Sequence, residues 1–105
     1  MKKIVKVGSH IKEKNKDPYL KELYELEVEK ANIAKLIIKH RLDNNMNQSQ
    51  LAVKVGVTQQ QISKIENGDF SSIITIAKVL LRIGYFLEIR PIKLSKSRAA
   101  RLQTV

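Results

Sequence analysis

Residues 47–68 read NQSQLAVKVGVTQQQISKIENG and contain two helix-start signals separated by a glycine. Asn47 and Thr58 are good N-cap residues, and each is followed three positions later by a glutamine that can return a hydrogen bond to the backbone of the cap. Gly56 lies between them, where a left-handed residue ends a helix at little cost. Apolar residues recur at helical spacing after each cap and are expected to face a core: Leu51, Ala52, Val55, Ile62 and Ile65. The pattern predicts two short helices around a tight turn, a helix-turn-helix.

The outward residues of the second helix indicate DNA binding. Glutamine can pair with N6 and N7 of adenine in the major groove, and lysine can reach O6 and N7 of guanine. The alternative is that glutamine is only a soluble helix former here. Three glutamines in a row at the front of a solvent-facing helix, in a basic chain, favour base reading. The residues expected to read bases are Gln59, Gln60, Gln61 and Lys64.

The motif resembles the helix-turn-helix of the phage-repressor and Cro family, also called the XRE family. The residues that carry the resemblance are Asn47, Gln48, Leu51, Ala52, Val55, Gly56, Thr58, Gln59, Gln60, Glu66, Asn67 and Gly68. The resemblance implies that the first two glutamines of the second helix read bases, and that the third glutamine and Lys64 tune the recognised sequence. It also implies an ion pair between Arg41 of the preceding helix and Glu66. The residues expected to contact the DNA backbone are Gln48, Lys54, Thr58, Ser63 and Asn67.

The composition is that of one globular domain, with 105 residues, 29% of them charged and 43% hydrophobic. The chain has no cysteine, which excludes a disulfide framework and a zinc knuckle and is compatible with a reducing cytoplasm. No apolar run approaches the roughly 20 residues of a transmembrane helix. Lysines and a glycine also interrupt any signal-peptide core near the N-terminus. We therefore expect a cytoplasmic protein.

The net charge of +10 is unevenly distributed along the chain. Residues 1–16 carry +5, residues 17–29 carry −4, and residues 30–105 carry +9. The basic part, which contains the helix-turn-helix, suits a polyanion, because releasing counterions from DNA drives such binding. The acidic block does not suit DNA and requires a different explanation.

The N-terminal third contains a basic arm and an acidic helix. A basic arm is predicted at residues 1–16, with a short edge strand at residues 3–7 as the alternative. Asp17 is a good N-cap and Pro18 suits the first helical position, so the two predict a helix start. We assign the acidic helix to residues 17–30.

The apolar stripe of this helix changes face near residues 30–32, which predicts a bend or a break there. One continuous helix to about Asp43 is the alternative. The helix-turn-helix DNA-binding domain is assigned to residues 31–84.

A last helix of this domain is expected to begin after Ser71 or Ser72 and to end at Gly84. Its predicted buried face consists of Ile73, Ile76, Ala77, Leu80 and Leu81. Three apolar residues lie off the buried stripes and mark a possible dimer contact: Val53, Ile74 and Val79.

Residues 85–91 read YFLEIRP and alternate in the manner of a β-strand that ends at proline. A lone strand needs a partner. Residues 3–7 are one option, but the same strand of a second copy is favoured, because a two-fold axis also suits palindromic DNA. The side chains assigned to this dimer strand are Phe86, Leu87 and Ile89. Residues 92–105 predict a basic tail that contacts phosphate or stays disordered.

The predicted fold class is therefore all-α: a five-helix, repressor-like helix-turn-helix domain with an extra N-terminal helix. One short C-terminal β-strand is added, paired across a homodimer. No sign of an enzyme, a cofactor site or a metal site is present. His10 and His40 have no spaced carboxylate, and the four glycines form no phosphate-binding loop.

A second function follows from the acidic helix, which a plain repressor domain does not require. Its carboxylates and apolar side chains could lie on a basic protein and mask its cationic surface. The residues assigned to this contact are Tyr19, Leu20, Glu22, Leu23, Tyr24 and Glu27. The order of elements over residues 17–91 resembles HigA-type antitoxins. That resemblance implies an antitoxin that neutralises a RelE/HigB-like toxin that cleaves messenger RNA, and that represses its own operon as a dimer. The alternative is a stand-alone phage-repressor-like regulator without a toxin partner.

Overall fold

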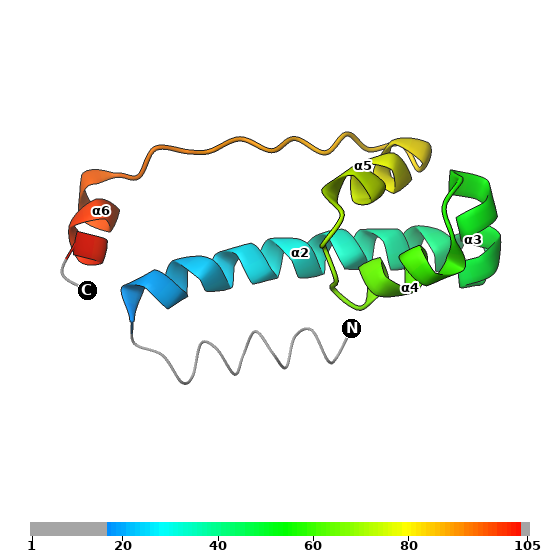
Figure 1. Ribbon diagram of the computed structural model, residues 1–105, viewed down its shortest axis with the longest axis horizontal. Helices are drawn as coiled ribbons and strands as arrows, with labels where there is room; N and C mark the ends of the chain where they lie inside the picture. Colours follow the sequence, from blue (N-terminus) through cyan, green and yellow to red (C-terminus); the bar gives the residue numbers. More distant parts are fainter. Residues whose placement is uncertain (1–16, 104–105) are drawn as a thin grey trace.

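The computed structural model describes residues 17–103, and their regular structure is entirely helical (Figure 1). The helices are α2 (Pro18–Asp43), α3 (Gln48–Val55), α4 (Gln59–Glu66), α5 (Ile73–Arg82) and α6 (Lys96–Gln103). The basic arm and the edge strand predicted at residues 1–16 lie outside the described residues. No described helix is long and apolar enough to cross a lipid bilayer.

Helix α2 is one continuous helix of 26 residues, so the break predicted near residues 30–32 is wrong. It begins as expected, because the Asp17 carboxylate accepts a hydrogen bond from the Tyr19 N–H at 2.9 Å and Pro18 occupies the first turn. The change of apolar face has another cause. Only the C-terminal half of α2 packs on α3, α4 and α5, whereas the N-terminal half extends beyond them (Figure 1). The apolar stripe therefore changes face because only its second part has to match the core.

The core lies where the second half of α2 meets α3, α4 and α5. Its largest fully buried side chains are Ile37, Leu51, Val55, Ile62, Ile76 and Val79. The buried residues predicted for the two helix-turn-helix helices are all in this core.

Helix α5 buries Ile76 and Leu80 as predicted, but the rest of its buried face differs from the prediction. Val79 is fully buried rather than part of a dimer surface, whereas Ile73 and Leu81 are 42% and 60% exposed. The helix packs through a stripe that ends at Ile83, one residue past its last turn. Spacings of three and four residues fitted both stripes, and only the position of α3 and α4 selects between them.

The β-strand predicted at residues 85–91 is not formed, since no strand occurs among residues 17–103. Residues 85–95, which we call the strap, have no regular structure and run back along α2 from the end of α5 (Figure 1). A strand requires a neighbouring backbone to bond to, and no other described segment in this single chain supplies one.

The tail predicted at residues 92–105 contains a helix instead. The strap leads into α6, which packs against the N-terminal end of α2 (Figure 1). The Ser95 hydroxyl oxygen accepts a hydrogen bond from the Arg98 N–H at 3.3 Å and helps the helix to begin. Arg98 of α6 thus contacts Glu22 of α2, a residue 76 positions earlier in the sequence.

Candidate nucleic-acid interface

Helix α4 holds its polar side chains outward because its opposite face is embedded in the core. Ile62, Ile65 and Glu66 are buried, whereas Gln59, Gln60 and Lys64 are exposed. The two glutamine amides and the ammonium group form no hydrogen bond with another described side chain or backbone group. They stand on the N-terminal two turns of a short helix, the part of a recognition helix that reaches base edges.

Both predicted capping boxes are present, and one of them includes Gln61, a residue predicted to read bases. The Gln61 amide oxygen accepts a hydrogen bond from the Thr58 N–H at 2.9 Å, while the Thr58 hydroxyl oxygen accepts from the Gln61 N–H at 3.1 Å. Asn47 and Gln50 make the equivalent pair at the start of α3, both bonds at 2.8 Å. Bidentate adenine recognition needs the amide oxygen of glutamine. In Gln61 this oxygen already accepts the hydrogen bond from the Thr58 N–H.

The turn between α3 and α4 has the predicted left-handed residue, Gly56, with φ of 75°. Lys78 of α5 donates a hydrogen bond from Nζ to the Gly56 carbonyl oxygen at 2.9 Å. Sequence reasoning missed this contact, because the two residues are 22 positions apart and no local pattern links them. This hydrogen bond connects α5 to the turn between α3 and α4.

A buried ion pair joins α2 to the end of α4. Arg41 donates from Nε to Glu66 Oε2 at 2.9 Å and from Nη2 to Glu66 Oε1 at 3.0 Å. A third bond runs from Arg41 Nη1 to the Met46 carbonyl oxygen at 3.2 Å. The structure therefore contains the ion pair that the family resemblance implies.

Gln48, expected to hold a DNA phosphate, is part of the same network. Its amide nitrogen donates to Glu66 Oε1 at 3.1 Å. The Glu66 carboxylate, at the end of α4, therefore binds both Gln48 at the start of α3 and Arg41 of α2. The side chain is half-buried. In this structure the Gln48 side chain therefore links α3 to α4 inside the helix-turn-helix unit.

The other residues assigned to the DNA backbone lie around α3 and α4, with local partners. Lys54 Nζ lies 3.2 Å from His40 Nε2, which accepts its hydrogen bond. Asn67 donates from Nδ2 to the Ser63 carbonyl oxygen at 2.8 Å and caps the C-terminus of α4. Lys54 and Asn67 are both exposed, so solvent and ligands reach them.

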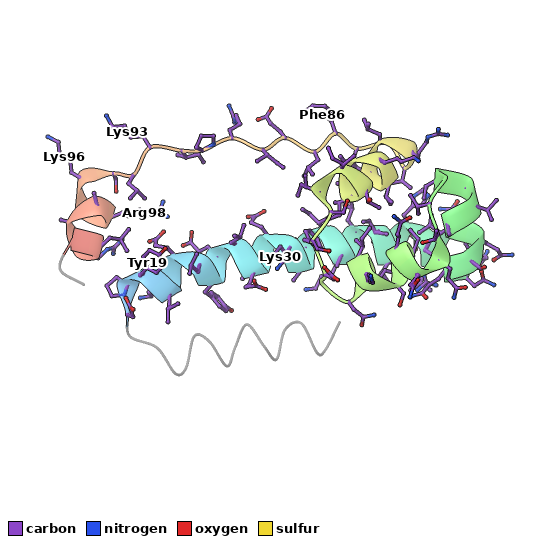
Figure 2. All side chains as sticks on the ribbon, in the orientation of Figure 1. Tyr19, Lys30, Phe86, Lys93, Lys96 and Arg98 are labelled. Atoms are coloured by element: carbon purple, nitrogen blue, oxygen red, sulfur yellow. The ribbon has the colours of Figure 1, made fainter. Side chains whose placement is uncertain are left out.

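The residues assigned to a protein partner occupy two faces of the protruding half of α2. At 100° per residue, Glu22 points to the same side as Pro18 and Glu25, which is the side that α6 covers. Tyr19, Leu23 and the other assigned residues point to different sides of the helix. Figure 2 shows Arg98 beside this end of α2, and Phe86, Lys93 and Lys96 along the outer side of the strap and α6.

The acidic residues are not all free. Arg98 donates from Nε to Glu22 Oε1 at 3.2 Å and from Nη2 to Glu22 Oε2, and Glu25 lies 3.7 Å from the same nitrogen. These hydrogen bonds hold the pKa of Glu22 below its ordinary value and raise the pKa of Arg98. Glu27 pairs with Lys30 at 3.2 Å.

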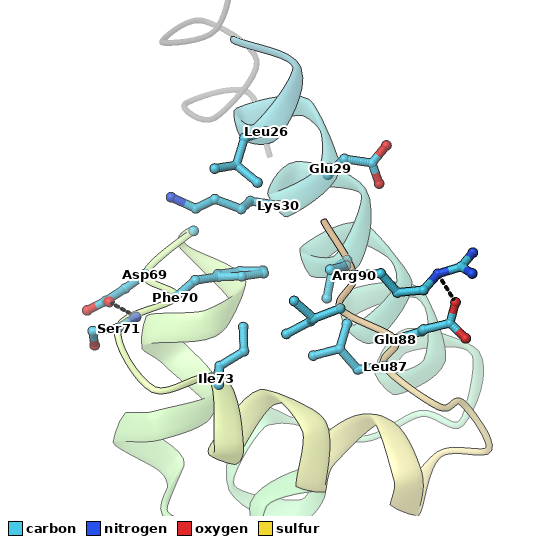
Figure 3. Close-up of a pocket in the computed structure, with 13 residues that line it drawn as sticks. Leu26, Glu29, Lys30, Asp69, Phe70, Ser71, Ile73, Leu87, Glu88 and Arg90 are labelled. Atoms are coloured by element: carbon cyan, nitrogen blue, oxygen red, sulfur yellow. Dashed lines mark hydrogen bonds and ion pairs between the residues drawn. The ribbon is translucent and has the colours of Figure 1, made fainter. Parts of the chain in front are cut away.

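A groove of about 820 Å³ lies where the strap passes α2 and the loop before α5 (Figure 3). Its apolar wall combines side chains from three parts of the chain: Leu26, Ile33, Phe70, Ile73, Leu87 and Ile89. Lys30 Nζ lies 5.8 Å from the centre of the Phe70 ring, and Glu88 pairs with Arg90 at 2.6 Å on the rim. Two of the predicted dimer-strand residues, Leu87 and Ile89, thus line a groove in the single chain.

Comparison with known proteins finds a similarity for the central part of this structure. Residues 37–81 match a family model described as Helix-turn-helix. The match supports an XRE/Cro-type helix-turn-helix domain and a DNA-binding transcriptional regulator. It does not extend to the acidic half of α2, the strap or α6. No curated protein and no solved structure matches the chain.

Proposed function

We propose that the protein is a DNA-binding antitoxin, which represses its own operon as a dimer and neutralises a basic, RelE/HigB-like toxin that cleaves messenger RNA. The DNA-binding part follows from the matched domain. The toxin-binding part is proposed from the acidic half of α2, which lies outside that domain. Each part has its own support and its own test.

The observation that carries DNA binding is the position of Gln59, Gln60 and Lys64. They stand exposed on a helix whose other face is locked by the core and by the Arg41–Glu66 ion pair. A helix held so rigidly offers its polar groups in one orientation, and pre-organised groups lose less entropy when they bind. Together with the net charge of +10, this arrangement suits insertion into the major groove.

We propose a dimer because one α4 covers only a half-site. Two recognition helices about 34 Å apart would enter successive major grooves on one face of the duplex. The strap is the segment we assign to pairing with a second copy. Its Phe86 and Ile89 side chains are exposed in the single chain, and backbone pairing between two straps would satisfy groups that now face water.

Selection of duplexes from a random library tests the DNA part. We expect the full-length protein to enrich a palindromic sequence with half-sites one helical turn apart. The double variant Gln59→Ala/Gln60→Ala should lose that preference while retaining nonspecific binding. Asn32→Ala, which removes an exposed amide from α2, is the control and should enrich the same sequence. Enrichment of no sequence by the wild-type protein would contradict the proposal.

Charge and exposure support the toxin part. Residues 17–29 contain five carboxylates and one lysine, and this half of α2 extends beyond the helix-turn-helix domain (Figure 1). Exposed Tyr19 and Leu23 add apolar surface beside the charges. A cationic toxin that binds RNA would be attracted to such a surface and masked by it.

Co-expression with a small basic protein encoded next to this chain tests the toxin part. We expect the neighbour to arrest growth alone and the wild-type chain to restore growth. Leu23→Arg should fail to restore it, since the variant places a cation among the assigned contact residues, one helical turn from Glu27. Leu42→Arg is the control, at the other end of the same helix and 59% exposed, compared with 43% for Leu23. A harmless neighbour would favour the stand-alone regulator.

A further inference from the structure

Helix α6 is a basic helix bound to an acidic one. Its charged side chains are all cationic: Lys96, Arg98 and Arg101. Arg98 forms two hydrogen bonds with the Glu22 carboxylate and approaches Glu25 (Figure 2). Arg101 lies with Pro18, Lys21, Glu22 and Glu25 around a hollow of about 330 Å³. The charge of α6 therefore complements that of the α2 face it covers.

Charge, rather than a core, holds α6 in place. The side chains of Glu22 and Arg98 remain 24% and 38% exposed, and none of the residues of the hydrophobic core comes from α6. Ion pairs that water reaches are weak and exchange readily, because solvent screens the charges. Beyond Leu87, which packs against the core, the strap that tethers α6 has no regular structure, so release of α6 requires no helix to unfold.

We infer that α6 is an internal occupant of the surface to which a basic helix of a partner protein binds, and that the partner displaces α6 when it binds. The inference deepens the toxin-binding proposal and rests on it for the identity of the partner. The expected occupant is a cationic helix with apolar side chains next to its charges, the pattern that α6 itself has at Ala99 and Leu102. DNA does not fit this surface, because phosphates are repelled by the carboxylates of Glu22 and Glu25.

Such an internal competitor lowers the affinity of the surface for every weaker ligand. The apparent dissociation constant rises by the inverse of the fraction of chains in which α6 is released. A partner must therefore offer a better charge match than α6, which improves selectivity against other basic proteins.

A distance measurement on the full-length chain tests whether α6 is held by Arg98. The chain has no cysteine, so Val53→Cys and Ala100→Cys, both at exposed positions, provide two unique sites for spin labels. We expect a narrow distance distribution for the otherwise wild-type chain and a broad one for Arg98→Glu. Reversing the pair with Glu22→Arg and Arg98→Glu should narrow the distribution again. If Arg98→Glu leaves it narrow, the inference is wrong.

Dilution with unlabelled protein distinguishes α6 bound to its own chain from α6 bound to a second copy. Label pairs within one chain keep their narrow distribution when diluted, and this is the expected result. Loss of the narrow component would show that α6 binds a second copy instead, which would overturn the inference.

Competition with a peptide of residues 92–105 tests whether the surface accepts a basic helix from outside. We expect the peptide to bind full-length Arg98→Glu and to bind the wild-type chain about tenfold more weakly, as follows if about nine in ten wild-type chains hold α6 in place. The same peptide carrying Arg98→Glu is the control and should bind neither protein. Equal binding to both proteins, or to neither, would contradict the inference. No toxin is needed, so failure here is distinct from failure of the proposed function.

Discussion

Arg41 in α2 and Glu66 at the end of α4 meet through two parallel hydrogen bonds of 2.9 and 3.0 Å, 25 residues apart in sequence. Their side chains are only 16% and 5% exposed, and Gln48 of α3 donates to the same carboxylate. One ion pair therefore sets the position of α4 relative to the helices on either side of it. A displaced α4 would no longer aim Gln59 and Gln60 at the same base pairs.

Replacing Glu66 by Ala should lower the free energy of unfolding by about 3 kcal/mol, because it leaves the buried Arg41 guanidinium without its counterion. The double variant Arg41→Met/Glu66→Leu should cost less than Glu66→Ala alone, since both charges are removed together. Urea denaturation measures both. Lys39→Ala is the control: it removes the exposed ion pair with Asp43 and should not change the midpoint measurably. A loss for Glu66→Ala no larger than that of the control would be evidence against the role of the pair.

Replacing Gly56 by Ala should cost about 1–2 kcal/mol of stability. The backbone there has φ of 75°, which L side chains rarely adopt, whereas an added Cβ would come no closer than 3.7 Å to Lys78. The expected cost is thus backbone strain and not a steric clash. Gly56→Asn should cost less, because asparagine tolerates the left-handed region better than alanine does. Equal midpoints for the two variants in thermal denaturation would argue against strain as the cause.

Replacing Gln60 by Ala should weaken binding to the selected operator by about 1–3 kcal/mol and relax the preference at the bases it reads. Lys54→Ala should instead weaken binding evenly across sequences and reduce the slope of affinity against salt by about one. Fluorescence anisotropy with matched and mismatched duplexes at several salt concentrations separates the two effects. The assignments are reversed if Gln60→Ala changes the salt slope and Lys54→Ala changes the base preference.

Docking of α6 should weaken in acid. The hydrogen bonds from Arg98 lower the pKa of Glu22 below its ordinary value of 4.5. A carboxyl group whose pKa is lowered on docking stabilises the docked form above the ordinary pKa, and this stabilisation is lost as the pH falls through the lowered value. The other charges at this contact are Arg101, Lys21 and Glu25.

We therefore expect the narrow spin-label distribution of the wild-type chain to broaden as the pH falls below 4.5. Glu22→Gln should give a broader distribution already at neutral pH and show a much smaller change in acid. An unchanged wild-type distribution through this range would contradict the assignment. Far-ultraviolet circular dichroism at each pH checks that the helix-turn-helix domain stays folded.

The sequence by itself determined the helix-turn-helix unit, because its signals are local. Each capping box joins residues three positions apart, and Gly56 acts through its own φ angle. Helical spacing also identified the buried residues of α3 and α4. The ion pair between Arg41 and Glu66 was reached only through the family resemblance, since nothing in the local pattern links two residues 25 positions apart.

Only the tertiary structure decided which alternatives were realised. Val79 is buried because α5 packs through one of two equally spaced stripes. The apolar stripe of α2 changes face without a break because the two halves of this continuous helix face different surroundings. The remaining surprises are contacts over long separations: Gln48 with Glu66, Lys78 with Gly56, and Arg98 with Glu22. A local pattern carries no information about such partners. Packing brings them together, and their charges and hydrogen-bonding groups then form the contact.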